Sequence, residues 1–259
     1  MKPTLAYIEA LARKSGEILR AGIDHDFLIS YKGEIDLVTD MDQRSEEYLL
    51  GEIHRDFPEH QIVSEEVGLI KGDDCQTWYI DPLDGTVNYA HRIPLYTVSI
   101  AYAEGDQVIL GAVYDPSRDE LFTAERSKGA RLNGKPISIS KTRSLDQSLL
   151  VTGFPYDIRN NPETNLDNYT RFSLRTQGVR RIGSAALDLS YVACGRMDGF
   201  WELRLKAYDI AAGALIAAEA GAVVTNLDGS PDYLSSPVSI VAAVPGVHAE
   251  MLELLHYKA

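Results

Sequence analysis

The 259-residue chain combines 45% hydrophobic with 24% charged residues, a balance typical of globular proteins that excludes a disordered or fibrous chain. Its formal net charge of -13 repels nucleic-acid phosphates and anionic lipid, so we expect neither a nucleic acid nor a membrane as a partner. The first residues lack the apolar core of a signal peptide, and Cys75 and Cys194 form neither a zinc motif nor a disulfide framework. These features favour a cytoplasmic protein.

The N-terminal part of the sequence predicts two helices followed by a sheet. Apolar residues at helical spacing predict a helix over residues 4–21 and another over 43–57, which ends before Pro58. Turn residues separate the apolar runs that follow, so we expect an antiparallel sheet, and Asn133 with Gly134 is typical of a two-residue hairpin turn. The strands are expected at residues 61–64, 77–80, 97–104, 107–115 and 120–126.

From about residue 144 the sequence alternates between predicted strands and helices, which is typical of an α/β arrangement. One helix is expected to start at Pro162 with Asn161 as its N-cap. We therefore divide the chain into an N-terminal α+β half, residues 1–143, and a C-terminal α/β half, residues 144–259. Because neither an internal repeat nor a flexible linker is apparent, we expect the two halves to pack around one site.

A pair of aspartates follows one of the predicted strands. The apolar run TWYI leads into Asp81, Asp84 comes three residues later, and Gly85 with Thr86 begins a short helical turn. Two carboxylates held close together either share a proton or bind a cation, and helix-terminal amides bind anions, so this arrangement favours a cation that bridges carboxylate and phosphate. The alternative interpretation is that Asp81 and Asp84 only stabilise a turn between strand and helix.

Three other acidic segments add to this pattern. They lie at residues 36–42 before a predicted helix, at 64–68 after a predicted strand, and at 208–213 at the start of a helix. Each alone is more typical of a helix cap or a solvated turn than of a functional site, but together they indicate a shared site. Oxygen ligands without His or Cys are those that a hard divalent ion such as Mg2+ prefers.

The sequence resembles the inositol monophosphatase family of magnesium-dependent, lithium-sensitive phosphatases over nearly its whole length. The segments that carry the resemblance are DLVTDMDQ (36–43), SEEVG (64–68), WYIDPLDGTVNY (78–89), GSAALDLSYVACGRMDGFWE (183–202) and YDIAAG (208–213). The resemblance implies a layered αβαβα sandwich of the inositol monophosphatase and fructose-1,6-bisphosphatase type. It also implies two or three Mg2+ ions per site and a homodimer.

The resemblance further implies roles for individual residues. The implied metal ligands are Glu65, Asp81, Asp84, Asp209 and the backbone carbonyl of Leu83. The implied substrate contacts are Asp84, Gly85, Thr86, Ser184, Ala185 and Glu202, with Glu202 on the alcohol part. Glu65 and Thr86 would activate the attacking water, Asp42 would orient Thr86, and Lys32 resembles the lysine of a segment that completes the site.

The implied reaction is Mg2+-dependent hydrolysis of a small polyol phosphate monoester by a metal-activated water, with inositol monophosphate as the first candidate substrate. Fructose 1,6-bisphosphate, alone or as a second substrate, NADP and other small phosphates are alternatives within the same chemistry. A different class is a regulatory or binding protein that keeps the fold without turnover. The intact set of acidic residues favours the enzyme.

Several residues near the motifs have two interpretations. Ser184 is expected to contact substrate, to cap the helix that follows, or to do both. Arg180 and Arg181 either attract phosphate or form a solvated surface pair, and Arg204 is expected at the edge of the site. We interpret His91 as structural, because a metal-activated water makes a histidine acid unnecessary.

Overall fold

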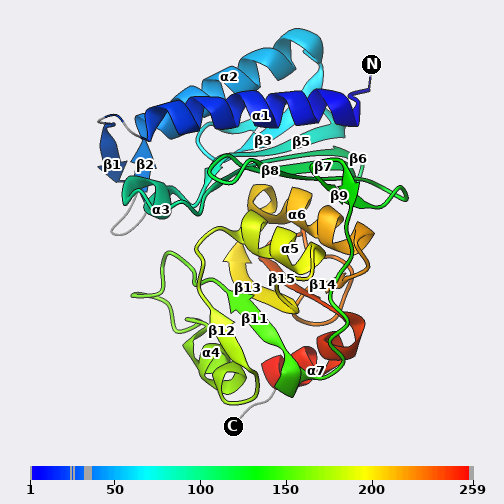
Figure 1. Cartoon of the computed structure of the whole chain (residues 1–259). Coiled ribbons are helices and arrows are strands. Elements are labelled where there is room, and N and C mark those ends of the chain that lie inside the picture. Colours follow the sequence, from blue (N-terminus) through cyan, green and yellow to red (C-terminus); the bar gives the residue numbers. More distant parts are fainter. Residues whose placement is uncertain (1, 24, 26, 32–36, 257–259) are drawn as a thin grey trace.

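A pair of helices covers one face of a large sheet (Figure 1). The computed structural model describes residues 2–23, 25, 27–31 and 37–256. The two helices confirm those expected over 4–21 and 43–57; they are α1 (Leu5–Gly22) and α2 (Asp40–Asp56). Thr4 begins α1, since its hydroxyl accepts a backbone hydrogen bond of 3.2 Å from the first turn. Thr39 and Asp42 cap α2 reciprocally, so that Asp42 is fixed at the start of this helix.

The large sheet has eight described strands in the order β10-β9-β8-β7-β6-β5-β3-β4. Their bounds are β3 (His60–Ser64), β4 (Gly68–Ile70), β5 (Asp73–Asp84), β6 (Thr97–Glu104), β7 (Gln107–Asp115), β8 (Glu120–Glu125), β9 (Ala130–Leu132) and β10 (Lys135–Pro136). Asn133 and Gly134 join β9 to β10 with φ of 49° and 76°, which confirms the expected hairpin turn. Two short strands, β1 (Ile29–Tyr31) and β2 (Leu37–Thr39), pair separately, and α3 (Thr86–Ala90) follows β5.

The expected antiparallel sheet is confirmed, with one exception that matters for the site. Strands β3 and β5 are parallel, with Ser64 opposite Ile80. Strand β4 turns back along one edge of β3, and the chain then turns again before β5 occupies the other edge, so β5 runs in the direction of β3. The carboxyl ends of β3 and β5 therefore lie side by side.

The second sheet is mixed and has the order β12-β11-β13-β15-β14 among the described strands. Strand β11 pairs in parallel with β12 and β13, whereas β15 pairs antiparallel with β13 and β14. The bounds are β11 (Leu149–Thr152), β12 (Gly178–Arg180), β13 (Gly199–Leu205), β14 (Val223–Thr225) and β15 (Val238–Ala243). The associated helices are the 3-10 turn η1 (Leu145–Gln147), α4 (Leu166–Ser173), α5 (Ala185–Ala193), α6 (Ala207–Glu219) and α7 (Pro245–His256).

The helix expected to begin at Pro162 begins later, at Leu166, so that prediction was wrong. The Asn161 side chain accepts a hydrogen bond of 2.9 Å from the Glu163 amide. This local bond forms an Asx turn, which competes with helix formation at the same residues. Asn165, with φ of 67°, then redirects the chain into α4.

The elements stack in five layers, which confirms the expected αβαβα sandwich (Figure 1). Helices α1 and α2 form the first layer, the large sheet the second, α5 and α6 the third, the mixed sheet the fourth, and α4 with α7 the fifth. The middle helices are apolar on nearly every face because both sheets cover them, and their buried residues include Leu187, Leu189, Ile210 and Leu215. Within the described residues, every helix is too short or too polar to cross a membrane.

Candidate active site

The parallel pair of strands β3 and β5 brings two acidic residues together. Glu65 directly follows β3, and its amide donates a hydrogen bond of 3.2 Å to the carbonyl oxygen of Ile80. Asp81, the next residue on β5, is 2% exposed. Burial raises the pKa of the Asp81 carboxyl well above its usual range, and the charge of Glu65 raises it further. The two carboxylates thus share one small space at the end of the sheet.

A buried glutamate that the sequence analysis missed fixes the turn that carries Glu65. The Glu46 carboxylate, from α2, accepts a hydrogen bond of 2.5 Å from the Ser64 hydroxyl. The same oxygen accepts bonds of 3.1 and 3.2 Å from the amides of Glu66 and Val67. Three bonds from one turn to one carboxylate hold its backbone around Glu65. In the sequence, only the helical periodicity that places Glu46 on the buried face of α2 could have suggested this role.

The turn after Asp81 brings the Thr86 side chain into contact with Asp42. Asp81 accepts a hydrogen bond of 3.0 Å from the Leu83 amide, which bends the chain at the end of β5. The Thr86 hydroxyl lies 3.0 Å from the Leu83 carbonyl oxygen and 3.1 Å from Asp42 Oδ1. Asp42 is fully buried, and burial raises its pKa to about 6. The expected contact between Asp42 and Thr86 is present.

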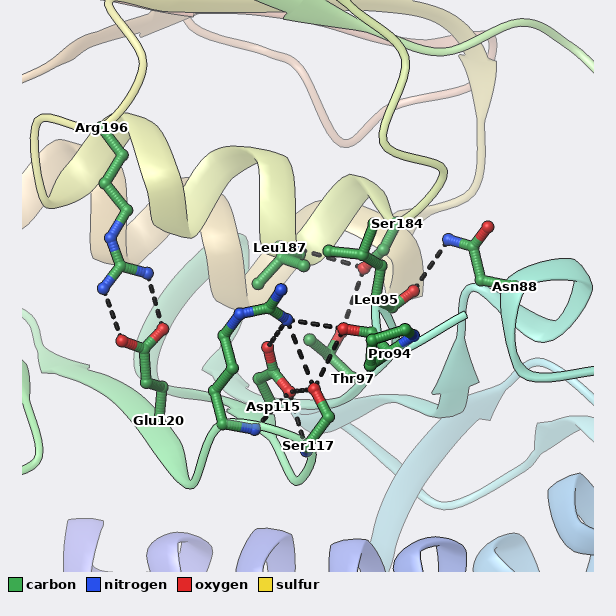
Figure 2. A network of polar contacts seen from close by, with 11 residues as sticks. Asn88, Pro94, Leu95, Thr97, Asp115, Ser117, Glu120, Ser184, Leu187 and Arg196 are labelled. Atoms are coloured by element: carbon green, nitrogen blue, oxygen red, sulfur yellow. Dashed lines mark hydrogen bonds and ion pairs between the residues drawn. The ribbon is translucent and has the colours of Figure 1, made fainter. Parts of the chain in front are cut away.

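Gly85 occupies a position that a side chain would not fit. Its φ of 96° lies in the left-handed region, and a Cβ there would lie 2.9 Å from the Leu95 carbonyl oxygen. Asn88 holds the same oxygen with a hydrogen bond of 2.8 Å, as Figure 2 shows. Asn88 also donates a bond of 2.9 Å to the Ile182 carbonyl oxygen in the C-terminal part of the chain. The backbone of Gly85 and Thr86 is therefore packed tightly and faces the cavity described below.

Asp84 connects the end of β5 to the start of helix α5. Its Oδ2 atom accepts hydrogen bonds of 2.7 Å from the Ser184 hydroxyl and 2.7 Å from the Ala186 amide. Ser184 also caps α5 by accepting a bond of 3.3 Å from the Leu187 amide, and its hydroxyl lies 3.3 Å from that of Thr97 (Figure 2). Burial raises the pKa of Asp84 to about 6, although the two bonds lower it. The expected N-cap role of Ser184 is confirmed.

Asp209 reaches the site from the first turn of α6. Its Oδ2 accepts a hydrogen bond of 2.7 Å from the Lys206 amide, which fixes the carboxylate at the helix start. Burial raises the pKa of Asp209 well above its usual range, and the charges of Asp84 and Glu65 raise it further. Carboxylates from the two sheets and from the middle helix layer thus act on one another at one place.

These residues surround a cavity of about 210 Å³. Ten of the predicted site residues line it, namely Glu65, Asp81, Leu83, Asp84, Gly85, Thr86, Ser184, Ala185, Glu202 and Asp209. Asp42 is not among the residues that line the cavity, but it contacts the hydroxyl group of Thr86, which does line it. Arg181 and Arg204 line the cavity as well, whereas Lys32 lies outside the described residues.

The opposite side of the cavity contains Glu202, from β13. Its carboxyl group lies directly against Gly153, so that a Cβ at position 153 would overlap both carboxyl oxygens. Burial raises the pKa of Glu202 to about 8, Arg181 lowers it, and the charge of Asp84 raises it. The sequence analysis missed Gly153 and Asp188, which also line the cavity. Gly153 lies outside the segments that carry the resemblance, whereas Asp188 lies inside the segment 183–202, where only Ser184, Ala185 and Glu202 were expected at the site.

The donor set fits a hard divalent cation. Several buried or half-buried carboxylates face the cavity, and the pKa values of Asp81 and Asp209 are raised first by burial and then by the neighbouring carboxylates, both of which a bound cation would offset. The set contains carboxylate and carbonyl oxygens but neither imidazole nor thiolate, which is the preference of Mg2+. Among the described residues, the one group of three acidic or thiol side chains with ligand atoms within 4.8 Å is Asp73, Asp74 and Cys75, which is exposed.

Comparison with known proteins finds relatives over nearly the whole chain. A family model described as the inositol monophosphatase family matches residues 1–258. An inositol-1-monophosphatase from Synechocystis sp. is 47% identical over 221 residues, 85% of this chain and 77% of that protein. The Nus factor SuhB of Escherichia coli is 40% identical over 255 residues, 97% of this chain and 95% of that protein.

Solved structures agree in fold and extent. An inositol monophosphatase from Anabaena (Nostoc) sp. superposes with a TM-score of 0.88 at 40% identity, covering 97% of this chain and 94% of that one. The extragenic suppressor protein suhB from Bartonella henselae superposes with a TM-score of 0.91 at 35% identity, covering 97% and 98%. Sequence, fold and site together show that the chain belongs to the inositol monophosphatase family.

Proposed function

We propose that the chain is a Mg2+-dependent phosphatase that hydrolyses a small polyol phosphate monoester, with inositol monophosphate as the first candidate. The observation that carries this proposal is the convergence of Glu65, Asp81, Asp84 and Asp209 on one cavity. They arrive from three separate parts of the chain and face the same space as the backbone of Gly85 and Thr86. Carboxylates that hold cations beside amides that hold an anion are suited to a phosphate ester.

The ligands proposed for Mg2+ are Glu65, Asp81, Asp84, Asp209 and the Leu83 carbonyl. Bound Mg2+ would neutralise the phosphate and lower the pKa of the attacking water. The Thr86 hydroxyl donates to Asp42 or to the Leu83 carbonyl oxygen, which leaves its own oxygen free to accept a hydrogen bond from that water. Glu65 then accepts a proton from the water as the water oxygen attacks phosphorus. The phosphorus–oxygen bond to the alcohol breaks, and the departing alkoxide takes a proton from solvent water. Asp42 is a positioning residue in this scheme.

The rest of the cavity is proposed to hold the ester. The amides of Gly85 and Thr86 would bind phosphate oxygens, whereas Ser184, Ala185 and Glu202 would contact the alcohol. At about 210 Å³ the cavity is smaller than the range of about 300–1,000 Å³ typical of sites for drug-sized ligands. This size supports an alcohol comparable with a single sugar ring and disfavours NADP.

Fructose 1,6-bisphosphate, alone or as a second substrate, remains the alternative within the same chemistry. A second phosphate needs a cation, and Arg181 and Arg204 both line the cavity. Arg204, however, already forms an ion pair of 2.6 Å with Asp157. The neighbouring Glu163 lies 3.9 Å from the same guanidinium. These carboxylates compete with a second phosphate, so we place the bisphosphate behind the monophosphate.

The family resemblance carries further proposals. It supports lithium sensitivity, two or three Mg2+ ions per site and a homodimer. The net charge of -13 and the sparse cysteines support a cytoplasmic protein without a nucleic-acid or membrane partner. The resemblance also supports a chain organised as halves 1–143 and 144–259, with Asp209 as the metal ligand from the second half. A regulatory role without turnover is the alternative that the name Nus factor of several relatives raises. In the present chain every proposed ligand position holds an acidic side chain or, at Leu83, a backbone carbonyl, and this complete set supports the phosphatase.

Phosphate release tests the proposal. The purified chain would be incubated with Mg2+ and, separately, inositol 1-phosphate, fructose 1,6-bisphosphate, NADP, histidinol phosphate and 3'-phosphoadenosine 5'-phosphate. We expect the highest kcat/KM for inositol 1-phosphate, complete loss with EDTA, and loss by more than about 100-fold in Asp81→Asn. Undiminished turnover in EDTA or in Asp81→Asn would refute the metal site, and turnover of none of these esters would favour the regulatory class.

A further inference from the structure

Asp188 is a buried carboxyl group that the proposed mechanism does not use. It lies in the first turn of α5, is 1% exposed and lines the cavity together with Glu202. Its Oδ1 atom is buried and lacks a hydrogen-bond partner among the described residues. A carboxyl oxygen that is buried without a partner costs free energy, so its presence at this place requires an explanation.

The helix itself does not provide that explanation. Ser184 is the N-cap of α5 and accepts the hydrogen bond from the Leu187 amide, so the side chain of Asp188 is not needed as a cap. The Asp188 amide is satisfied by the Ser184 carbonyl oxygen, 3.0 Å away, as in any helix. Every residue of α5 is buried, and an apolar residue at position 188 would avoid the cost of burying a carboxyl group without a partner.

Charged groups from three other elements face Asp188. Burial raises its pKa well above the usual range, and the charges of Glu202 on β13 and of Asp84 at the end of β5 raise it further. The charge of Arg181, which lies between β12 and α5, lowers the pKa of Asp188. Within the described residues these neighbours leave the Oδ1 atom without a donor, so the free protein does not satisfy this atom.

The position of Glu202 gives the two carboxyl groups a common partner. Gly153 leaves room for the Glu202 carboxyl, and Glu202 carries the charge that acts most strongly on Asp188. Asp188 and Glu202 line the same cavity as Gly85 and Thr86, so both carboxyl groups are available to the alcohol when phosphate occupies the Gly85 and Thr86 amides. An alcohol with more than one free hydroxyl group could donate to both.

We propose that Asp188 is a specificity-determining residue, which with Glu202 accepts hydrogen bonds from hydroxyl groups of the alcohol and so selects polyol phosphates over phosphate esters of apolar alcohols. This inference rests on the proposed function. It adds to that function a requirement on the substrate: the alcohol must carry at least two hydroxyl groups besides the esterified one.

Two esters of the same ring test it. Inositol 1-phosphate carries free hydroxyl groups, and cyclohexyl phosphate has the same ring without them. In Asp188→Leu and Asp188→Ala we expect kcat/KM for inositol 1-phosphate to fall about 10- to 100-fold, mainly through KM, as for a substrate hydroxyl group left buried without a hydrogen-bond partner. For cyclohexyl phosphate we expect a change below about threefold. Asp188→Asn keeps a hydrogen-bonding group and should retain most of the preference.

Ser190→Ala is the matched control, because Ser190 is buried on the same helix and its hydroxyl bonds only to the Ala186 carbonyl oxygen among the described residues. It should leave the ratio of the two kcat/KM values unchanged. Equal losses for both esters in the Leu and Ala variants, or an unchanged ratio, would overturn the role of Asp188. If Leu fails to fold, the Ala and Asn variants decide. A wild-type chain that hydrolyses neither ester would instead overturn the proposed function and this inference with it.

Discussion

The Ser184 hydroxyl donates a hydrogen bond of 2.7 Å to Asp84, which joins the end of strand β5 to the first turn of helix α5. The same hydroxyl caps the helix, so one side chain fixes both a proposed metal ligand and the helix that carries Asp188. Stability and site geometry are therefore coupled at this residue.

Replacing Ser184 should affect both properties. In Ser184→Ala we expect the free energy of unfolding to fall by about 1–2 kcal/mol, because the N-cap is lost and a buried carboxylate oxygen loses a donor. We also expect weaker Mg2+ affinity, since Asp84 is less well fixed. Urea unfolding and a Mg2+ titration of phosphatase activity measure the two effects. Thr170→Val, whose hydroxyl bonds to a carbonyl within exposed α4, is the control and should change neither. Unaltered Mg2+ affinity in Ser184→Ala would contradict the coupling.

Gly153 should be essential for the position of Glu202. An alanine at 153 would overlap the Glu202 carboxyl, which must then rotate within a buried site. We expect Gly153→Ala to fold and to raise KM for inositol 1-phosphate about tenfold, as an effect of moving one hydrogen-bonding group. Gly51→Ala is the control, since Gly51 lies in helix α2 with open space around it and alanine should stabilise the helix by about 0.5–1 kcal/mol. The prediction fails if KM in Gly153→Ala equals that of Gly51→Ala.

The stability of the metal-free protein should depend on pH through Glu202. Its pKa is raised from 4.5 to about 8 by burial, so the folded state holds this proton more tightly than the unfolded state. The corresponding stability is present in full below pH 4.5 and is lost as pH rises through about 8. We expect Glu202→Gln to stabilise the chain in EDTA more at pH 8 than at pH 5. Thermal unfolding of both proteins at the two pH values measures this, and a difference that does not vary with pH would contradict it.

Asp81 should have opposite effects on the metal-free and the Mg2+-bound protein. Asp81→Asn removes a buried charge that Glu65, Asp84 and Asp209 disfavour, so we expect a higher melting temperature in EDTA. Millimolar Mg2+ should raise the melting temperature of the wild type and much less that of the variant, because the ion binds the native state only. Asp106→Asn, in the exposed turn between β6 and β7, should behave as wild type. An equal Mg2+ shift in all three proteins would exclude Asp81 as a ligand.

Much of the fold could be predicted because its signals are local. The helix periods, the Pro58 stop and the Asn133-Gly134 turn each act within a few residues, and the structure has these elements. The parallel pairing of β3 with β5 could not be predicted, because it depends on where β4 returns along the sheet. Asn161 was misinterpreted because one asparagine can cap a helix or form an Asx turn equally well.

The candidate site likewise has residues that the sequence predicts and residues that it does not. Glu65 and Asp81 lie at the ends of predicted strands and Asp209 lies at the start of a predicted helix. The structure brings their carboxylates to one cavity. Glu46 lies outside the recognised segments, and Asp188 lies within one of them, 183–202, but on a helix where the sequence alone does not show which way its side chain faces. Their positions become significant only when distant segments fold against them, as the turn at Ser64 does on Glu46.

The middle layer has one further consequence for an acidic chain. Both of its helices begin at the cavity, α5 after Ser184 and α6 after Lys206, so their electropositive ends point into it. A net charge of -13 repels a phosphate ester at long range, but this repulsion is screened beyond about 8 Å at physiological ionic strength. Within the cavity the carboxylates also repel an anion unless a cation neutralises them, and the helix ends and Arg181 then add attraction from fixed backbone dipoles and a guanidinium. Binding of a phosphate ester by this acidic chain should therefore depend on the short-range field of the cavity and not on the net charge of the surface.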